Sequence, residues 1–124
     1  MILWQILRYE KIVRHNKINR VIRDEKGEYT VIVSNVRFTF FQYPFQIAAP
    51  KQFQDIIRLP DLLTLGAMKA YALGRRAKWK DYVDLYFIIK NYHTIHEIIK
   101  RAVQIFRSEF NEKTFVFSSP ILKI

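Results

Sequence analysis

The chain has 124 residues, no cysteine and a formal net charge of +10. This length suits one domain, and the lack of thiols excludes disulfides and cysteine-bound zinc. Half of the residues are hydrophobic and 15% are aromatic, which excludes a disordered chain because such a sequence can bury a core. No segment approaches the roughly 20 uncharged apolar residues of a membrane span, and Arg8 and Glu10 follow the apolar start too soon for a signal peptide. We therefore expect one soluble, cytoplasmic domain.

The basic charge, with a sequence pI near 10.0, favours a polyanionic partner such as nucleic acid or nucleotide. Lysine and arginine side chains neutralise phosphates and release condensed counterions. A solvated basic surface that only keeps the protein soluble explains the same charge, because charge alone carries no specificity. Both interpretations stay open at this point.

The first 60 residues predict a helix followed by an antiparallel meander. Apolar residues at helical spacing indicate a helix over residues 2–16 with a basic outer face. Strands are expected at residues 18–24, 29–33 and 36–43, which are rich in β-branched and aromatic residues. Gly27 and Asn35 suit the positive φ angles of the tight turns between them. Phenylalanines on both faces near the end of the third strand predict that it is covered on both sides there.

The second half predicts a helical unit. Residues 45–60 are irregular, with a possible short strand at 55–59. Helices are expected at residues 61–73, 79–91 and 95–109. Asp61 is placed to cap the first, Gly74 and the arginines after it are expected to end it, and Thr94 with Glu97 forms a capping box for the third. Residues 114–117 form one more strand or an irregular tail. We thus expect a single α+β domain over residues 1–124, with helix and sheet in 1–60 and the helical unit in 61–110.

Lys69 is the only charged residue between Leu62 and Leu73 in the first of these helices. It shares a helical stripe with small and apolar residues, namely Leu62, Leu65, Gly66, Ala72 and Leu73. Because an unpaired buried ammonium is costly, the side chain either extends to water or finds a partner. That partner is a carboxylate of this chain or a phosphate of a ligand.

Asp81 and Asp84 lie three residues apart on one face of the next helix, together with Leu85 and Ile88. Two structural explanations compete with a functional one. Asp81 in the first turn interacts favourably with the helix dipole without any further role. Asp84 pairs with Arg75, Arg76 or Lys80 across a helical hairpin.

The segment between these two helices is strongly basic. Its candidate phosphate-binding residues are Arg75, Arg76, Lys78 and Lys80, with Trp79 available to stack on a base. A solvated loop is the alternative. The only closely spaced histidines, His93 and His96, have no third ligand nearby, so we expect no metal site.

The order of these residues resembles a known motif. The matching runs are Ala67-Met68-Lys69, Arg75-Arg76 and Lys80-Asp81-Tyr82-Val83-Asp84-Leu85-Tyr86-Phe87, with Val36–Tyr43 before Pro44 and Ile57-Arg58-Leu59 before Asp61 upstream. Together they are similar to the AbiEii/AbiGii family of nucleotidyltransferases over about residues 28–110. The resemblance implies a polymerase-β-like fold and transfer of a nucleotide from an NTP, with Mg²⁺, to an acceptor such as tRNA. Many members are toxins paired with an antitoxin.

By the same resemblance, Lys69, Lys80, Asp81 and Asp84 are the expected catalytic residues. The lysines face the triphosphate, and an aspartate orients them or assists the acceptor hydroxyl. The family also has a Gly-Ser or Gly-Gly motif followed by an Asp-x-Asp pair that binds metal. This sequence has neither, because Gly27 is its first glycine and Asp24-Glu25 is the only adjacent acidic pair before the meander. We therefore expect a truncated version of the polymerase-β-like fold. Such a chain, from a truncated or split gene product, is expected to be inactive alone.

Three functions remain open. The first is a half-enzyme that needs another chain to supply the metal-binding carboxylates. The second is a non-catalytic module that binds RNA or a nucleotide through the basic segment. The third is an interaction domain for an antitoxin or other partner, with the charge incidental. A missing half predicts an exposed apolar patch at Phe38 and Phe40 or along the Lys69 stripe, covered by a partner or in a homo-oligomer.

Overall fold

The computed structural model describes residues 18–76 and 78–118. The chain divides into two compact units, one ending at Pro44 and the other beginning at Phe45. The fold class is α+β, with a three-stranded antiparallel sheet followed by helices, as the sequence predicts. The helix predicted over residues 2–16 lies outside the described residues.

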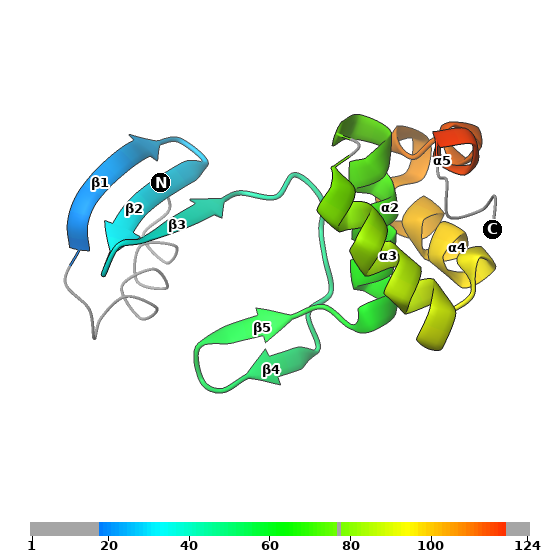
Figure 1. Cartoon of the computed structure of the whole chain (residues 1–124), viewed down its shortest axis with the longest axis horizontal. Coiled ribbons are helices and arrows are strands. Elements are labelled where there is room, and N and C mark those ends of the chain that lie inside the picture. Colours follow the sequence, from blue (N-terminus) through cyan, green and yellow to red (C-terminus); the bar gives the residue numbers. More distant parts are fainter. Residues whose placement is uncertain (1–17, 77, 119–124) are drawn as a thin grey trace. The chain divides into compact units, whose positions relative to one another are not determined.

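The sheet of the first unit is a meander of β1 (Ile18–Glu25), β2 (Glu28–Val33) and β3 (Val36–Phe41), in that spatial order (Figure 1). Gly27 in the first turn has a φ of 85°, and Ser34 and Asn35 in the second have φ angles of 49° and 64°. Positive φ at both central residues of a two-residue turn matches the twist of the flanking strands. Both predicted turns are confirmed.

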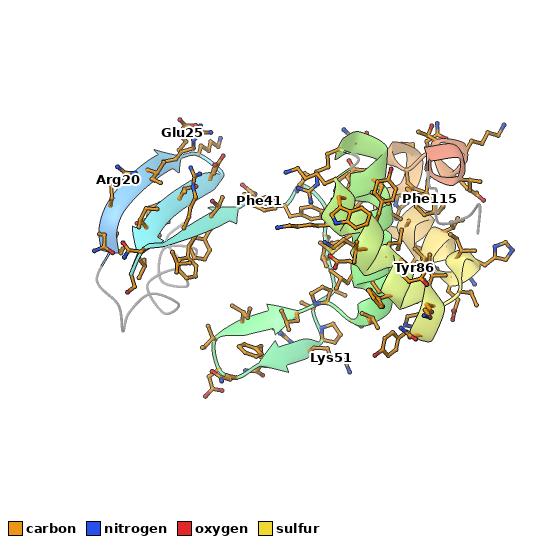
Figure 2. All side chains as sticks on the ribbon, viewed as in Figure 1. Arg20, Glu25, Phe41, Lys51, Tyr86 and Phe115 are labelled. Carbon is orange, nitrogen blue, oxygen red and sulfur yellow. The ribbon has the colours of Figure 1, made fainter. Side chains whose placement is uncertain are left out.

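A small core lies on one face of this sheet. Val31 and Val33 are buried, and Tyr29, Phe38 and Phe40 pack against them. On the other face, Thr30 donates a hydrogen bond to the hydroxyl of the directly opposite Thr39 at 3.1 Å. Phe41 at the end of β3 is 64% exposed, and Figure 2 labels its side chain there. The prediction that this end of the strand is covered on both faces is therefore wrong for Phe41.

A hairpin precedes the helices in the second unit. Its strands β4 (Lys51–Phe53) and β5 (Ile57–Leu59) are antiparallel, and β5 leads into the first helix. The short strand predicted at 55–59 is present as β5. Its partner β4 was not predicted, because three exposed residues give no alternation of apolar and polar positions.

Four α-helices follow within the described residues of this unit. They are α2 (Leu62–Arg76), α3 (Trp79–Asn91), α4 (Ile95–Phe106) and α5 (Glu112–Ser118), with a 3₁₀ turn, η1 (Arg107–Glu109), after α4. Helix α2 contacts α3, α4 and α5, and so occupies the centre of the unit (Figure 1).

Side-chain caps begin three of the helices. Asp61 accepts a hydrogen bond from the Thr64 amide at 2.7 Å, and Thr94 and Glu97 form the predicted capping box of α4. Asn111 accepts from the Thr114 amide at 3.1 Å and so begins α5. Each cap satisfies an amide that has no partner within its own helix.

Two predicted helix ends and one predicted element type are wrong. Helix α2 continues through Gly74 to Arg76, because this glycine does not adopt the positive φ that ends a helix. Helix α4 stops at Phe106, where Arg107 takes a φ of 50°. Residues 114–117 are neither a strand nor an irregular tail but part of α5, whose Phe115 is buried.

The core of the helical unit combines aliphatic contacts with stacked aromatic rings. The Tyr71 and Phe106 rings stack with their centroids 4.1 Å apart, and Phe45 contacts both rings edge-on. Gly66 allows close helix packing, because a Cβ added there would lie 3.3 Å from Ile98 Cγ1 in α4 and 3.5 Å from Ile88 Cγ2 in α3. None of the helices in the described part of the chain is long and apolar enough to cross a membrane.

Candidate functional site

Lys69 on α2 meets both aspartates of α3. Its Nζ lies 3.0 Å from Asp81 Oδ1 and 2.8 Å from Asp84 Oδ2. Of the alternatives that the sequence left open, the carboxylate partner is the one found. The rest of the stripe is buried or half-buried, so no apolar patch is exposed along it.

Arg76 completes this charged cluster, which consists of Lys69, Arg76, Asp81 and Asp84. The Nε of Arg76 lies 3.2 Å from Asp81 Oδ2, while Asp84 pairs with Lys69 rather than with Arg75, Arg76 or Lys80. The Asp81 side chain is only 3% exposed, against 51% for Asp84. The buried carboxylate therefore holds two cations, and the exposed one only assists.

Lys69 and Asp81 stabilise each other's charged forms. Burial alone would raise the pKa of Asp81, but its hydrogen bond to Lys69 and the charges of Lys69 and Arg76 outweigh burial and lower it. Burial likewise disfavours the Lys69 ammonium, but the hydrogen bonds to Asp84 and Asp81 outweigh it and raise the pKa of Lys69. Asp61 at the start of α2 also has a lowered pKa, mainly because it accepts the Thr64 amide hydrogen bond.

These shifts predict how the stability of the helical unit depends on pH. A carboxyl with a lowered pKa stabilises the fold above its unfolded-state pKa, and that contribution is lost as the pH falls through the folded-state pKa. A lysine with a raised pKa stabilises the fold below its unfolded-state pKa and loses that contribution as the pH rises through the folded-state value. Thermal unfolding followed by helical circular dichroism should therefore show stability falling below about pH 4 and above about pH 10.5. Asp81→Asn should flatten the acid side of this profile, and an unchanged acid side would contradict the assignment.

The basic turn, defined as Arg75, Arg76, Lys78, Trp79 and Lys80, joins α2 to α3. Two of its cations are already paired, since Arg76 binds Asp81 and Arg75 Nη2 lies 2.7 Å from Glu109 Oε2. Arg75 also lies 4.9 Å above the Tyr71 ring. Lys78 and Lys80 are exposed and have no ion-pair partner among residues 18–76 and 78–118. Trp79 is 76% exposed, so its ring is open for stacking.

The described residues do not fit Mg²⁺ at the charged cluster. Both oxygens of Asp81 contact cationic side chains, and one oxygen of Asp84 does so as well. Within residues 18–76 and 78–118, no three acidic, histidine or cysteine side chains come together in a way that could hold a metal ion. The cluster is suited to hold cationic side chains in place.

A second polar group was missed by sequence reasoning. Arg101 on α4 donates a hydrogen bond from Nη1 to the buried Thr64 hydroxyl at 2.7 Å and lies 3.6 Å from Asp61. It lines a pocket together with Arg107 and residues 46–48. The only signal in the sequence was a pair of arginines, Arg101 within α4 and Arg107 just after its last residue. Their spacing does not predict what they contact.

Comparison of the chain with models of known families, with curated proteins and with solved structures found no match.

Proposed function

We propose that the helical unit provides the phosphate- and acceptor-facing part of an NTP:tRNA nucleotidyltransferase site of AbiEii/AbiGii type. In this proposal the metal-binding carboxylates come from outside these 124 residues, and the chain is inactive alone. One observation carries the proposal. Lys69, Asp81 and Asp84, three of the four expected catalytic residues, converge at 2.8–3.0 Å although they come from two helices, while Lys80 stays exposed outside the cluster.

The position of the cluster beside the basic turn supports the same proposal. The buried Asp81 fixes Lys69 and Arg76, so that two cations are preorganised next to the free Lys78 and Lys80. A preorganised cation loses less entropy when it binds a phosphate than a freely rotating one. Asp84 is half exposed, and its pair with Lys69 is weak enough for a phosphate oxygen to replace it.

Each side chain has a role in this proposal. Lys78 and Lys80 bind phosphates of the NTP or of the RNA, and Trp79 stacks on a base. Lys69 faces the triphosphate once Asp84 is displaced, and Asp84 is then free to accept a hydrogen bond from the acceptor hydroxyl. Asp81 acts as a positioning residue, because both of its oxygens are occupied by cations.

A second candidate is a non-catalytic module that binds RNA. The observation that favours it is that two carboxylates already pair with the Lys69 ammonium. The unpaired cations of the described site then lie only in the basic turn, which suits RNA backbone phosphates without any transfer chemistry. The two candidates differ in whether a free NTP binds.

Binding of labelled tRNA and of labelled NTP to the whole chain tests the proposal. Lys78→Gln/Lys80→Gln should weaken both ligands by about tenfold and reduce the dependence of log Kd on log salt by about 1–2 for tRNA. Lys69→Ala is a poorer choice, because it leaves the buried Asp81 with one cation fewer. The control is Lys100→Gln/Lys113→Gln, which removes the same charge from exposed positions on α4 and α5.

The outcomes separate the candidates. If the basic-turn variant loses binding of both tRNA and NTP while the control pair retains it, the half-enzyme is supported. Loss of tRNA alone, with no NTP binding by the unmodified chain, supports the RNA-binding module instead. Equal weakening in the control pair shows that only net charge matters. No binding of either ligand overturns both candidates and leaves the interaction domain.

A further inference from the structure

A pocket of about 530 Å³ lies within the second unit, away from the basic turn. Its walls are the start of α2, the last turns of α4 and the segment 46–48. Phe45, next to that segment, packs on Tyr71 and Phe106, so the wall is anchored on the helical core. A volume of this size is within the range of pockets that hold a small molecule.

The pocket is rich in hydrogen-bond donors. Arg101 and Arg107 line it, with the amides of Gln46 and Gln104, and none of the described lining residues is acidic. Arg101 is held in place by Thr64 and by Asp61 just outside the lining. The Thr64 hydroxyl is buried, accepts from Arg101 and is itself hydrogen-bonded to the Asp61 carboxylate, so this contact fixes Arg101 in the pocket wall.

Arg107 adds a second, independent observation. Its φ of 50° with a ψ of −124° falls outside the regions that non-glycine residues usually adopt. Such a conformation costs roughly 1–3 kcal/mol, and strained residues of this kind cluster at active sites, ligand-binding sites and switch regions. It ends α4 and directs the chain into η1, with Arg107 in the pocket wall. Within the described part of the chain, this guanidinium has no acidic partner.

We propose that this arginine pocket, lined by Thr64, Arg101, Gln104 and Arg107, binds the phosphate group of a nucleotide-sized ligand. Two guanidinium groups form charge-assisted hydrogen bonds to phosphate oxygens, and neutral ligands lack this advantage. Thr64 and Arg76 lie twelve residues apart on α2, so the pocket is roughly 18 Å along the helix from the basic turn. It is therefore a separate anion site, and it does not depend on the function proposed above.

Isothermal titration of the whole chain with inorganic triphosphate, ATP, adenosine and a short RNA lacking terminal phosphates tests the proposal. Arg107→Gln should weaken triphosphate and ATP binding by at least about tenfold, as expected for one lost charge-assisted hydrogen bond. Gln104→Glu, which places an acidic group in the wall, should do the same without removing any contact that supports the fold. Lys100→Gln, an equal charge change elsewhere on α4, should retain triphosphate binding within about threefold. Lys78→Gln/Lys80→Gln is measured alongside it to separate anion binding at the basic turn from anion binding in the pocket.

The ligands identify the source of the phosphate. Loss of ATP and triphosphate binding in the pocket variants, with adenosine not bound at all, supports a free nucleotide. Loss of RNA binding in the same variants, without triphosphate binding, supports an RNA phosphate in the same pocket. Unchanged binding of all ligands in both pocket variants, or an equal loss in Lys100→Gln, overturns the proposal. A loss of triphosphate binding only in the basic-turn variant assigns all anion binding to that turn and also overturns it.

Discussion

Asp81→Asn is expected to destabilise the helical unit by about 2–3 kcal/mol, although it changes a single atom of the side chain. The carboxylate is 3% exposed and binds Lys69 at 3.0 Å and Arg76 at 3.2 Å. An asparagine amide keeps one oxygen but places a donor against one of these two cations. Because both cations retain access to water, the cost stays below that of a fully buried pair. Chemical unfolding followed by helical circular dichroism measures the difference.

Asp84→Asn is the matched control, since it removes the same charge from the same lysine. Asp84 is 51% exposed, and we expect a loss of less than about 1 kcal/mol. Similar effects of the two substitutions would show that burial of Asp81 does not matter, and would remove its assignment as the residue that fixes Lys69 and Arg76. The Asp84 variant is also suited to test whether Asp84 binds the acceptor hydroxyl in the RNA and NTP measurements, because its fold is expected to be intact.

Gly66→Leu is expected to cost about 3 kcal/mol or more, although leucine favours a helix over glycine by nearly 1 kcal/mol. A Cβ at this position already lies 3.3 Å from Ile98 Cγ1, before the rest of the side chain is added. The larger side chain must therefore push α2 away from α4 and α3. Hydrogen exchange of the amides of α2 and α4 should become faster together with the loss of stability in chemical unfolding.

Gly74→Leu provides the comparison within the same helix. A Cβ there has no heavy atom within 4 Å, so only the helix preference acts, and we expect a gain of about 0.5 kcal/mol. The difference in sign between the two glycines is the decisive result. A loss at Gly74 as large as that at Gly66 would mean that α2 does not pack on α4 as described.

Local patterns in the sequence predicted much of the fold. The two hairpin turns of the meander follow from Gly27 and Asn35, whose residue types tolerate positive φ. The capping box at Thr94 and Glu97 placed the start of α4 correctly, because both halves of that contact lie within four residues. Lys69 in an apolar stripe predicted a partner or a route to water, and the partner was found.

The errors have a common physical cause, which is that tertiary contacts decided the outcome. The tail with Thr114 and Val116 has β-branched residues that favour a strand, yet burial of Phe115 in the helical unit makes it helical. Gly74 was expected to end α2, but the pairing of Arg75 with Glu109 and of Arg76 with Asp81 extends the helix past it. Glu109 lies in η1 and Asp81 lies in α3, so the periodicity of α2 alone predicts neither pair.

The candidate site was predicted in part for the same reason. The sequence named Lys69, Asp81 and Asp84 but offered Arg75, Arg76 or Lys80 as the partner of Asp84, whereas Lys69 is the partner in the structure. Periodicity gives the face of a helix on which a residue lies, not the rotation of one helix against another. The arginine pocket could not be predicted from helix periodicity at all, because its wall combines residues 46–48, Thr64 and Arg101 from three distant segments.

The central position of α2 has a consequence for synthesis of the chain on the ribosome. Contacts in the meander join only neighbouring strands, so the sheet can close once β3 has emerged. Helix α2 instead buries Ala67 and Ala70 against elements that are made later, the last of which contains Phe115. At roughly 5–20 residues per second, the 39 residues that follow Arg76, up to and including Phe115, take about 2–8 s to translate. During this interval the apolar faces of α2 are available to chaperones. Lys69 also cannot pair with Asp81 until α3 has been synthesised.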